Sequence, residues 1–257
     1  MTGPCCVVVA LTETVLSTPI SSAMPSAGIT KINQATFTGL LTGGATTANI
    51  SDVEIEIYHV FPTDSNPPSG NVPTRANSPS DVEISSATRD GIAGTLSFTS
   101  TLLNDPFTVA NSVVNGIHPL PNQFTGGEGA VTGQEVLITV DFSTAILLDP
   151  SHYFFRPEVQ LGNSGDFLWL SAPLPIVDGT GPFTPDLQSW IRNDGPGGLA
   201  PDWLRVGTDI THQGPFNAAF SLSGETASAA VPEPSALLFL GAGLLGLAGL
   251  TIKRRLA

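Results

Sequence analysis

The feature that most limits the fold of this chain is the alternation of apolar and polar residues within short segments. In Asp52–Phe61, aliphatic side chains take the odd positions up to Ile57 and polar side chains take the even ones. A period of two is typical of a β-strand that has one face in the core and one in water. Further strands are predicted at 34–42, 81–85, 94–101, 107–114, 135–143, 153–161, 167–172 and 216–224.

Turn-forming residues separate these segments. The chain contains 27 Gly and 22 Pro, and they fall between the apolar stretches, as in Asp64-Ser65-Asn66-Pro67-Pro68. Many short strands without alternating helices favour an all-β fold. We therefore predict one antiparallel two-sheet β-sandwich, jelly-roll or Ig-like, over residues 24–225.

One helical pattern interrupts the strands. Leu187, Trp190 and Ile191 are spaced as one face of a helix, after Pro185 and before Gly195. The spacing predicts a short helix that caps one end of the sandwich.

The first 23 residues differ from the rest. The apolar run Cys5–Leu11 and the small residues Ser21-Ser22-Ala23 resemble parts of a leader, but Glu13 interrupts the region and no Lys or Arg precedes it. We interpret residues 1–23 as a remnant or atypical signal segment, with the true start upstream. Cys5 and Cys6 are the only cysteines, so the predicted domain is expected to be stable without disulfides.

The C-terminal end consists of three consecutive parts. An extended segment comes first, Val231-Pro232-Glu233-Pro234-Ser235, in which the prolines exclude helix. Ala236–Ile252 is then an uncharged run of 17 residues, about 26 Å long as a helix, near the thickness of a bilayer's hydrocarbon core. The cations Lys253, Arg254 and Arg255 follow, and such charges stay on the cytoplasmic side. Residues 236–257 therefore predict a transmembrane helix with a basic tail, and everything before it an exported domain.

This tripartite tail resembles the PEP-CTERM sorting signal of Gram-negative bacteria. The resemblance rests on Pro232-Glu233-Pro234, the Gly- and Leu-rich apolar run and the terminal cations, about the last 27 residues. It implies that exosortase, an integral-membrane cysteine enzyme, recognises and processes the tail, in a system associated with extracellular polysaccharide and biofilms. A plain membrane anchor without processing is the alternative, and a buried core helix is a weaker one.

The resemblance also sets the expected location. It implies a precursor anchored in the inner membrane, and later a protein of the cell surface or extracellular matrix. Residues 226–235 are expected to link the domain to the anchor, within a Ser-, Ala- and Pro-rich spacer at Ser221–Pro234. Gly241, Gly243 and Gly246 match a dinucleotide-binding spacing, but they lie inside the apolar run, where small residues favour close helix packing instead.

One region gathers residue types suited to a ligand. Indole rings stack on sugars, and Asp and Arg bind hydroxyl groups, so a carbohydrate site is conceivable; core packing of the rings is the favoured interpretation. The two aspartates equally suit Ca²⁺, although no D-x-D-x-D pattern is present. The candidate residues are Trp190, Arg192, Asp194, Asp202 and Trp203.

Signs of catalysis are sparse. His59, His118, His152 and His212 are too far apart in sequence for a local metal motif. Ser164 lies in a turn that does not match a nucleophile motif, and Glu54 and Glu56 are interpreted as the solvated side of a strand rather than a glycosidase pair. We predict no catalytic residues and no resident metal or cofactor.

The net charge of the chain limits the kinds of molecule that it is expected to bind. Nine Lys and Arg face 22 Asp and Glu, a net charge of −13, which disfavours nucleic-acid binding. Two function classes stay open: a non-enzymatic structural or adhesive surface module, which is favoured, and a secreted protein that binds or acts on polysaccharide. The expected partners are exosortase, the membrane and extracellular polysaccharide.

Overall fold

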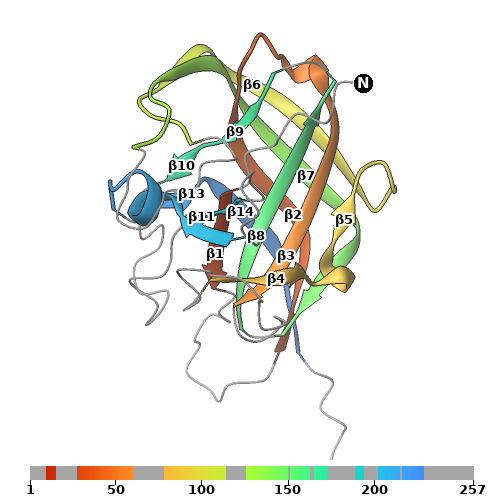
Figure 1. Cartoon of the computed structure of the whole chain (residues 1–257). Coiled ribbons are helices and arrows are strands. Elements are labelled where there is room, and N and C mark those ends of the chain that lie inside the picture. The colour runs from red at the N-terminus through yellow and green to blue at the C-terminus, as the bar shows by residue number, and fades with distance from the viewer. Residues whose placement is uncertain are drawn as a thin grey trace, which may run out of the picture.

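The structure is a computed structural model, and it describes residues 10–15, 28–60, 78–113, 126–149, 151–162, 165–172, 189–193, 202–214 and 216–228. Strands dominate these residues (Figure 1). The helical elements described are single turns: the 3-10 helices η1 (Thr47–Asn49) and η2 (Ser85–Ala87) and the π-helix η3 (Val206–Ile210). The prediction of an antiparallel all-β protein is confirmed.

Two large sheets and one small one organise the strands. The seven-stranded sheet has the order β12 (Asp202–Arg205), β11 (Ser189–Asn193), β1 (Ala10–Val15), β8 (His152–Leu161), β3 (Ile50–Val60) and β4 (Pro79–Glu83), with β5 (Arg89–Asp90) also on β3. The five-stranded sheet has the order β14 (Phe220–Ser228), β2 (Gly28–Leu41), β7 (Val131–Leu148) and β6 (Leu96–Val109), with β9 (Phe167–Trp169) also on β2. Strands β10 (Ser171–Ala172) and β13 (Asn217–Ala218) form a separate pair.

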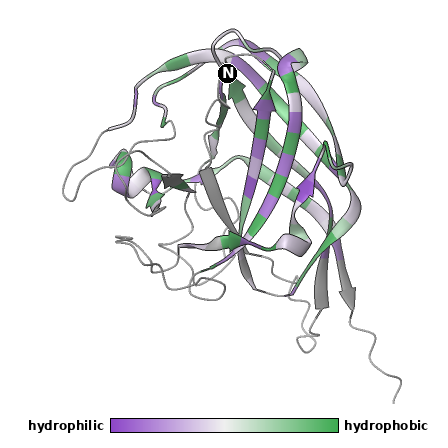
Figure 2. Ribbon diagram, turned by 45° about the vertical axis from the view of Figure 1, so that its right-hand side comes forward, coloured by the Kyte–Doolittle hydropathy of each residue, from purple (hydrophilic) through white to green (hydrophobic). Residues whose placement is uncertain are grey.

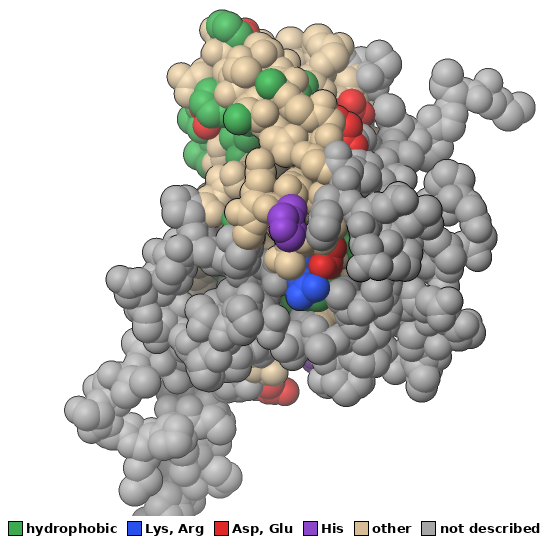
Figure 3. All heavy atoms as spheres, turned by 60° about the vertical axis from the view of Figure 1, so that its left-hand side comes forward, with side chains coloured by type: hydrophobic (Ala, Val, Ile, Leu, Met, Phe, Trp, Pro, Cys, Tyr) green, Lys and Arg blue, Asp and Glu red, His purple; other side chains and the backbone are tan. Residues whose placement is uncertain are grey.

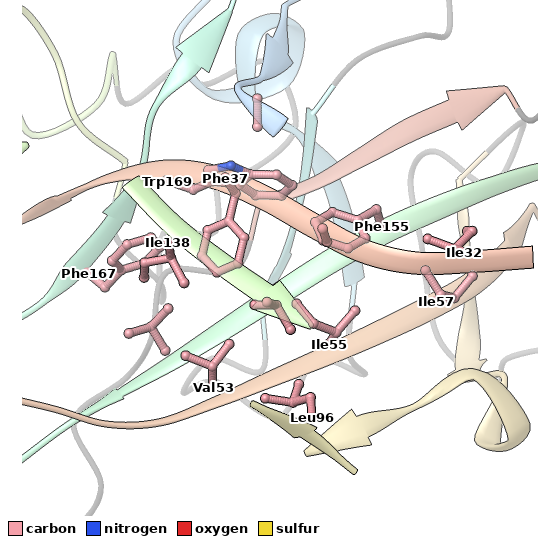
Figure 4. Close-up of a cluster of buried hydrophobic side chains, with 14 of the residues drawn as sticks. Ile32, Phe37, Val53, Ile55, Ile57, Leu96, Ile138, Phe155, Phe167 and Trp169 are labelled. Atoms are coloured by element: carbon pink, nitrogen blue, oxygen red, sulfur yellow. The ribbon is translucent and has the colours of Figure 1, made fainter. Parts of the chain in front are cut away.

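The two large sheets share one hydrophobic core. Phe37 of β2 and Ile138 of β7 come from one sheet, and Ile55 of β3 and Phe155 of β8 come from the other. All four side chains are buried, and Figure 4 shows them in one cluster. The alternation along the strands is visible as alternating colours in Figure 2. Alternation thus directs one face of each sheet to a common interior.

Three sequence predictions are corrected by strand pairing. The two strands predicted at 94–101 and 107–114 are one strand, β6, which continues through Pro106. Proline is tolerated there because Pro106 lies in a shift of the β6–β7 register between Asn104 and Phe107, where it has no partner on β7. The strand predicted at 167–172 is split into β9 and β10, which belong to different sheets.

The predicted helix around Trp190 is wrong in its described part. Ser189–Asn193 is strand β11, paired with both β1 and β12. Trp190 and Ile191 are as compatible with strand as with helix, and the two neighbouring strands satisfy their backbone groups. Residues 185–188, 194 and 195 lie outside the described residues.

Part of the predicted leader segment lies inside a sheet. Ala10–Val15 forms β1, which pairs with β8 on one side and with β11 on the other. Removal of residues 1–23 would therefore take out a strand with two neighbours.

Candidate functional site

The folded domain extends almost to the sorting segment. Strand β14 ends at Ser228, three positions before Val231, and it pairs with β2 from Phe220 to Ser228. The predicted spacer Ser221–Pro234 is therefore wrong over its first eight residues, because these pair with β2 instead of hanging free. Pro232 thus follows the last residue of β14 by four positions.

The sorting residues themselves lie outside the described residues, as does the predicted transmembrane helix. These are Val231, Pro232, Glu233, Pro234, Ser235, Lys253, Arg254 and Arg255. Within the part of the chain that the structure describes, no helix is long and apolar enough to cross a membrane.

The two candidate tryptophans pack on the outer face of the seven-stranded sheet, which we define as the face opposite the shared core. Tyr58 and Phe154 are cross-strand partners one residue away from the core pair Ile57 and Phe155, so they point to the outer face. Trp190 and Trp203 join them in one buried cluster.

Packing in this outer cluster is edge to face. Trp203 meets Tyr58 at 5.8 Å between ring centroids and 79° between planes, and Trp190 meets Phe154 at 6.4 Å and 85°. Trp190 is 0% and Trp203 1% exposed. Such contacts are those of core aromatics. Neither ring offers an open face on which a sugar can stack.

Polar contacts of the two indoles differ. Trp203 Nε1 donates to Ser80 O at 3.2 Å, whereas Trp190 Nε1 is buried and has no hydrogen-bond partner among the described residues. The guanidinium carbon of Arg205 lies 5.9 Å from the centroid of the Trp190 ring, and Arg205 is also ion-paired with Asp209.

For the other three candidate residues, Arg192, Asp194 and Asp202, the structure describes at most the backbone. The backbone of Arg192 pairs with that of Trp203, and the backbone of Asp202 pairs with that of Asn193. Asp194 lies outside the described residues. Among the described residues, no group of three or more His, Cys, Asp and Glu side chains is placed to hold a metal ion. Calcium binding at Asp194 and Asp202 stays a prediction.

A polar network that sequence reasoning missed lies beside the aromatic cluster. Glu56 of β3 is ion-paired with Arg156 of β8, which also pairs with Glu158, and Tyr58 Oη donates to Glu56 Oε2 at 2.8 Å. The side chain of Glu56 is only 12% exposed, so the interpretation of Glu56 as a solvated strand acid is wrong. Glu56 and Arg156 stand opposite each other in the β3–β8 register, 100 residues apart in sequence.

The ionisable groups of this network are bonded to one another and are therefore poorly placed to exchange protons with a ligand. The carboxylate of Glu56 is bound by Arg156 and Tyr58. Burial raises the pKa of Tyr58, which keeps its hydroxyl protonated at neutral pH. The described geometry is that of a structural ion-pair network. His59 lies against Tyr153, with 5.4 Å between ring centroids, while His118 and Ser164 fall outside the described residues.

Glu54, the next acid along β3, supplies a pH-dependent prediction. Partial burial, followed by the nearby charges of Glu56 and Asp90, raises the pKa of Glu54. A carboxyl whose pKa is higher in the folded than in the unfolded state binds more protons when folded, so its contribution to stability falls as pH rises through that window. We expect Glu54→Gln to stabilise the protein at neutral pH, because glutamine removes a charge that burial and the neighbouring acids disfavour. The gain is expected to be only a few tenths of a kcal/mol, because the group is partly exposed and solvent screens these interactions.

The measurement is urea unfolding of the wild type and of Glu54→Gln between about pH 4 and pH 8, around the ordinary glutamate pKa. The difference is expected to vanish at the acidic end. Glu225→Gln, on an exposed position of β14, serves as the matched control. A variant that is less stable than wild type at neutral pH would contradict the prediction.

Among known protein families, a match is found for the tail of this chain. No curated protein and no solved structure matches this chain. The model of the PEP-CTERM protein-sorting motif matches residues 230–255. This chain therefore carries the sorting motif of a PEP-CTERM sorting-domain protein, directly after the last strand that the structure describes.

Proposed function

We propose that this chain is an exported protein delivered by its PEP-CTERM tail through exosortase. The observation that carries the proposal is the match of residues 230–255 to the sorting motif. In this proposal the precursor is held in the inner membrane by residues 236–257, with Lys253, Arg254 and Arg255 on the cytoplasmic side. Processing then releases the domain to the cell surface or the extracellular matrix, among extracellular polysaccharide.

The exported part is proposed to be a non-enzymatic structural or adhesive β-sandwich. Two sheets around a shared core support the sandwich, and the network of Glu56, Arg156 and Tyr58 is accounted for by internal pairing. The carbohydrate-binding alternative relied on the rings of Trp190 and Trp203. Because both rings are buried, no specific observation favours it.

The position of β14 sharpens this proposal. With the domain ending at Ser228, only residues 229 and 230 precede Val231, so exosortase has to engage Pro232-Glu233-Pro234 beside a folded sheet edge. By sequence, prolines on both sides of Glu233 disfavour a helix there, and an extended segment would suit recognition by an enzyme.

The test is the state of the tail in cells with and without exosortase, measured by fractionation and intact mass. We expect loss of the C-terminal segment only when the enzyme is present. Glu233→Ala combined with Pro232→Ala is expected to lower the processed fraction at least tenfold. Glu225→Ala, an exposed acid on β14 outside the motif, is the matched control and is expected to be processed as wild type. An intact tail in both strains would overturn the proposal and leave a simple membrane anchor.

A further inference from the structure

Strand β14 consists of two parts that are separated by a break in its pairing with β2. Phe220–Ser223 pairs with β2 in one continuous register, which then shifts between Ser223 and Gly224. Gly224–Ser228 pairs with the start of β2 beyond that shift. A shift of this kind interrupts the ladder of hydrogen bonds, so it divides the strand into two segments.

The part before the shift is fixed in the hydrophobic core. The ring of Phe220 stacks on that of Phe155, which belongs to the other large sheet, with 5.1 Å between ring centroids and 10° between planes. Leu222 also packs against the shared core. Burial of these apolar side chains holds Phe220–Ser223 on the domain.

The described residues after the shift are held mainly by the ladder itself. Among the described strands, β14 pairs with β2 only. Gly224 and Glu225 are exposed, and a Cβ atom at Gly224 would overlap the backbone carbonyl of Lys31. Glu225 stands opposite Lys31, and a surface pair of opposite charges contributes little in water. Segments with few buried contacts open locally while the rest of a domain stays folded.

This second part lies where the tail begins. Ser228 is its last residue and pairs with Gly28, the first residue of β2, at the lower end of the molecule in Figure 1. Figure 3 keeps the same vertical axis and shows hydrophobic side chains gathered at the upper end of one face. That exposed apolar surface is therefore remote from the end of β14 and does not hold it in place.

The chain between the sheet and the predicted membrane segment is short. Residues 229–235 separate Ser228 from Ala236, where the apolar run begins, and this length of chain reaches at most about 24 Å when extended. Pro232 follows Ser228 by four positions, a reach of about 14 Å. The six strands in line in the larger sheet span about 24 Å, which is wider than that reach. A fully paired β14 therefore keeps the domain close against a membrane enzyme that binds Pro232-Glu233-Pro234.

We propose that release of Glu225–Ser228 from β2 regulates the processing of the tail, an inference that rests on the proposed function. Release adds residues 225–228 to the free chain and extends the reach to Pro232 from about 14 Å to about 27 Å. The shift at Gly224 sets where release stops, because Phe220 and Leu222 hold the preceding part in the core. The pairing of β14 with β2 thus sets the rate at which exosortase removes the tail.

The test locks the two parts of β14 to β2 separately, in the full-length chain with Cys5 and Cys6 changed to Ser. Directly paired residues of an antiparallel sheet have Cα atoms within disulfide distance. Gly28→Cys with Ser228→Cys, the end lock, fixes the part that is proposed to open. Thr36→Cys with Ser221→Cys fixes the part before the shift and is the matched control, because the two hydroxyl oxygens already lie 2.8 Å apart.

We expect the oxidised end lock to be processed at least tenfold more slowly than wild type in membranes that contain exosortase, and reduction of the disulfide to restore the rate. Intact mass over time measures the processed fraction. The control lock is expected to be processed as wild type. Insertion of Gly-Ser-Gly-Ser between Ser228 and Ala229 of the end lock lengthens the free chain and is expected to restore processing without reduction. That rescue distinguishes a short reach from a damaged domain.

Two results would overturn this inference and leave the sorting proposal intact. The first is an oxidised end lock that loses its tail at the wild-type rate, since the motif would then be accessible with β14 fully paired. The second is a slow end lock that the insertion does not rescue, since reach would then not be the limit. If the wild-type chain keeps its tail in the presence of exosortase, the proposed function fails and this inference fails with it.

Discussion

Replacement of Trp203 by alanine is expected to lower the free energy of unfolding by about 3–5 kcal/mol, the range for removing a buried large aromatic side chain. The side chain is 1% exposed, packs against Tyr58 and donates to Ser80 O. Its loss would open a cavity in the outer cluster and leave Tyr58 without its edge-to-face partner. Urea unfolding of the full-length chain measures the change.

The conservative control is Trp203→Phe. It keeps most of the ring volume and loses mainly the hydrogen bond to Ser80 O, so we expect a loss of about 1–2 kcal/mol.

The same variants distinguish the two proposed classes of function, structural and carbohydrate-binding. If Trp203→Ala left stability unchanged and abolished binding to an extracellular polysaccharide, the ring would be a ligand contact and the carbohydrate alternative would replace the structural one.

Replacement of Arg89 by methionine is expected to cost about 2–3 kcal/mol, because hydrogen bonds made by a charged group contribute about 1.5–3 kcal/mol. Arg89 is 9% exposed, and its guanidinium donates to four backbone carbonyl oxygens, those of Thr144, Ala145, Ser86 and Thr88. Thr144 and Ala145 belong to β7, whereas Arg89 belongs to β5 on the other large sheet. Arg89 therefore ties the two sheets together.

Methionine fills much of the space of the arginine stem but cannot donate, so the carbonyls of Thr144 and Ala145 would lose their donor. Burial lowers the pKa of Arg89, although the group stays charged at neutral pH. Arg89→Lys is the matched control: it keeps the charge but lacks the planar fork, and an intermediate loss is expected. A change below about 1 kcal/mol for Arg89→Met, the value of an ordinary hydrogen bond, would contradict the bridging role.

The sorting tail was readable from the sequence because its parts are contiguous. A short Pro-flanked acid, an apolar run and terminal cations act locally, and none of them depends on a distant residue. The match to residues 230–255 confirms that prediction. The prediction of a spacer before the tail was wrong over Ser221–Ser228. This segment is rich in small polar residues, but it pairs with β2 along its whole length.

Alternation alone determined that this chain is an all-β protein, and it placed most strands, because a period of two is a property of each segment by itself. Only the tertiary structure decided which strands are neighbours. It made β11 a strand instead of a helix, placed Glu56 opposite Arg156 across 100 residues of sequence, and buried Trp190 and Trp203 on the outer face. The physical reason is that a strand's hydrogen bonds are made with other segments, so its partners are fixed by packing of the whole chain and leave no local signal.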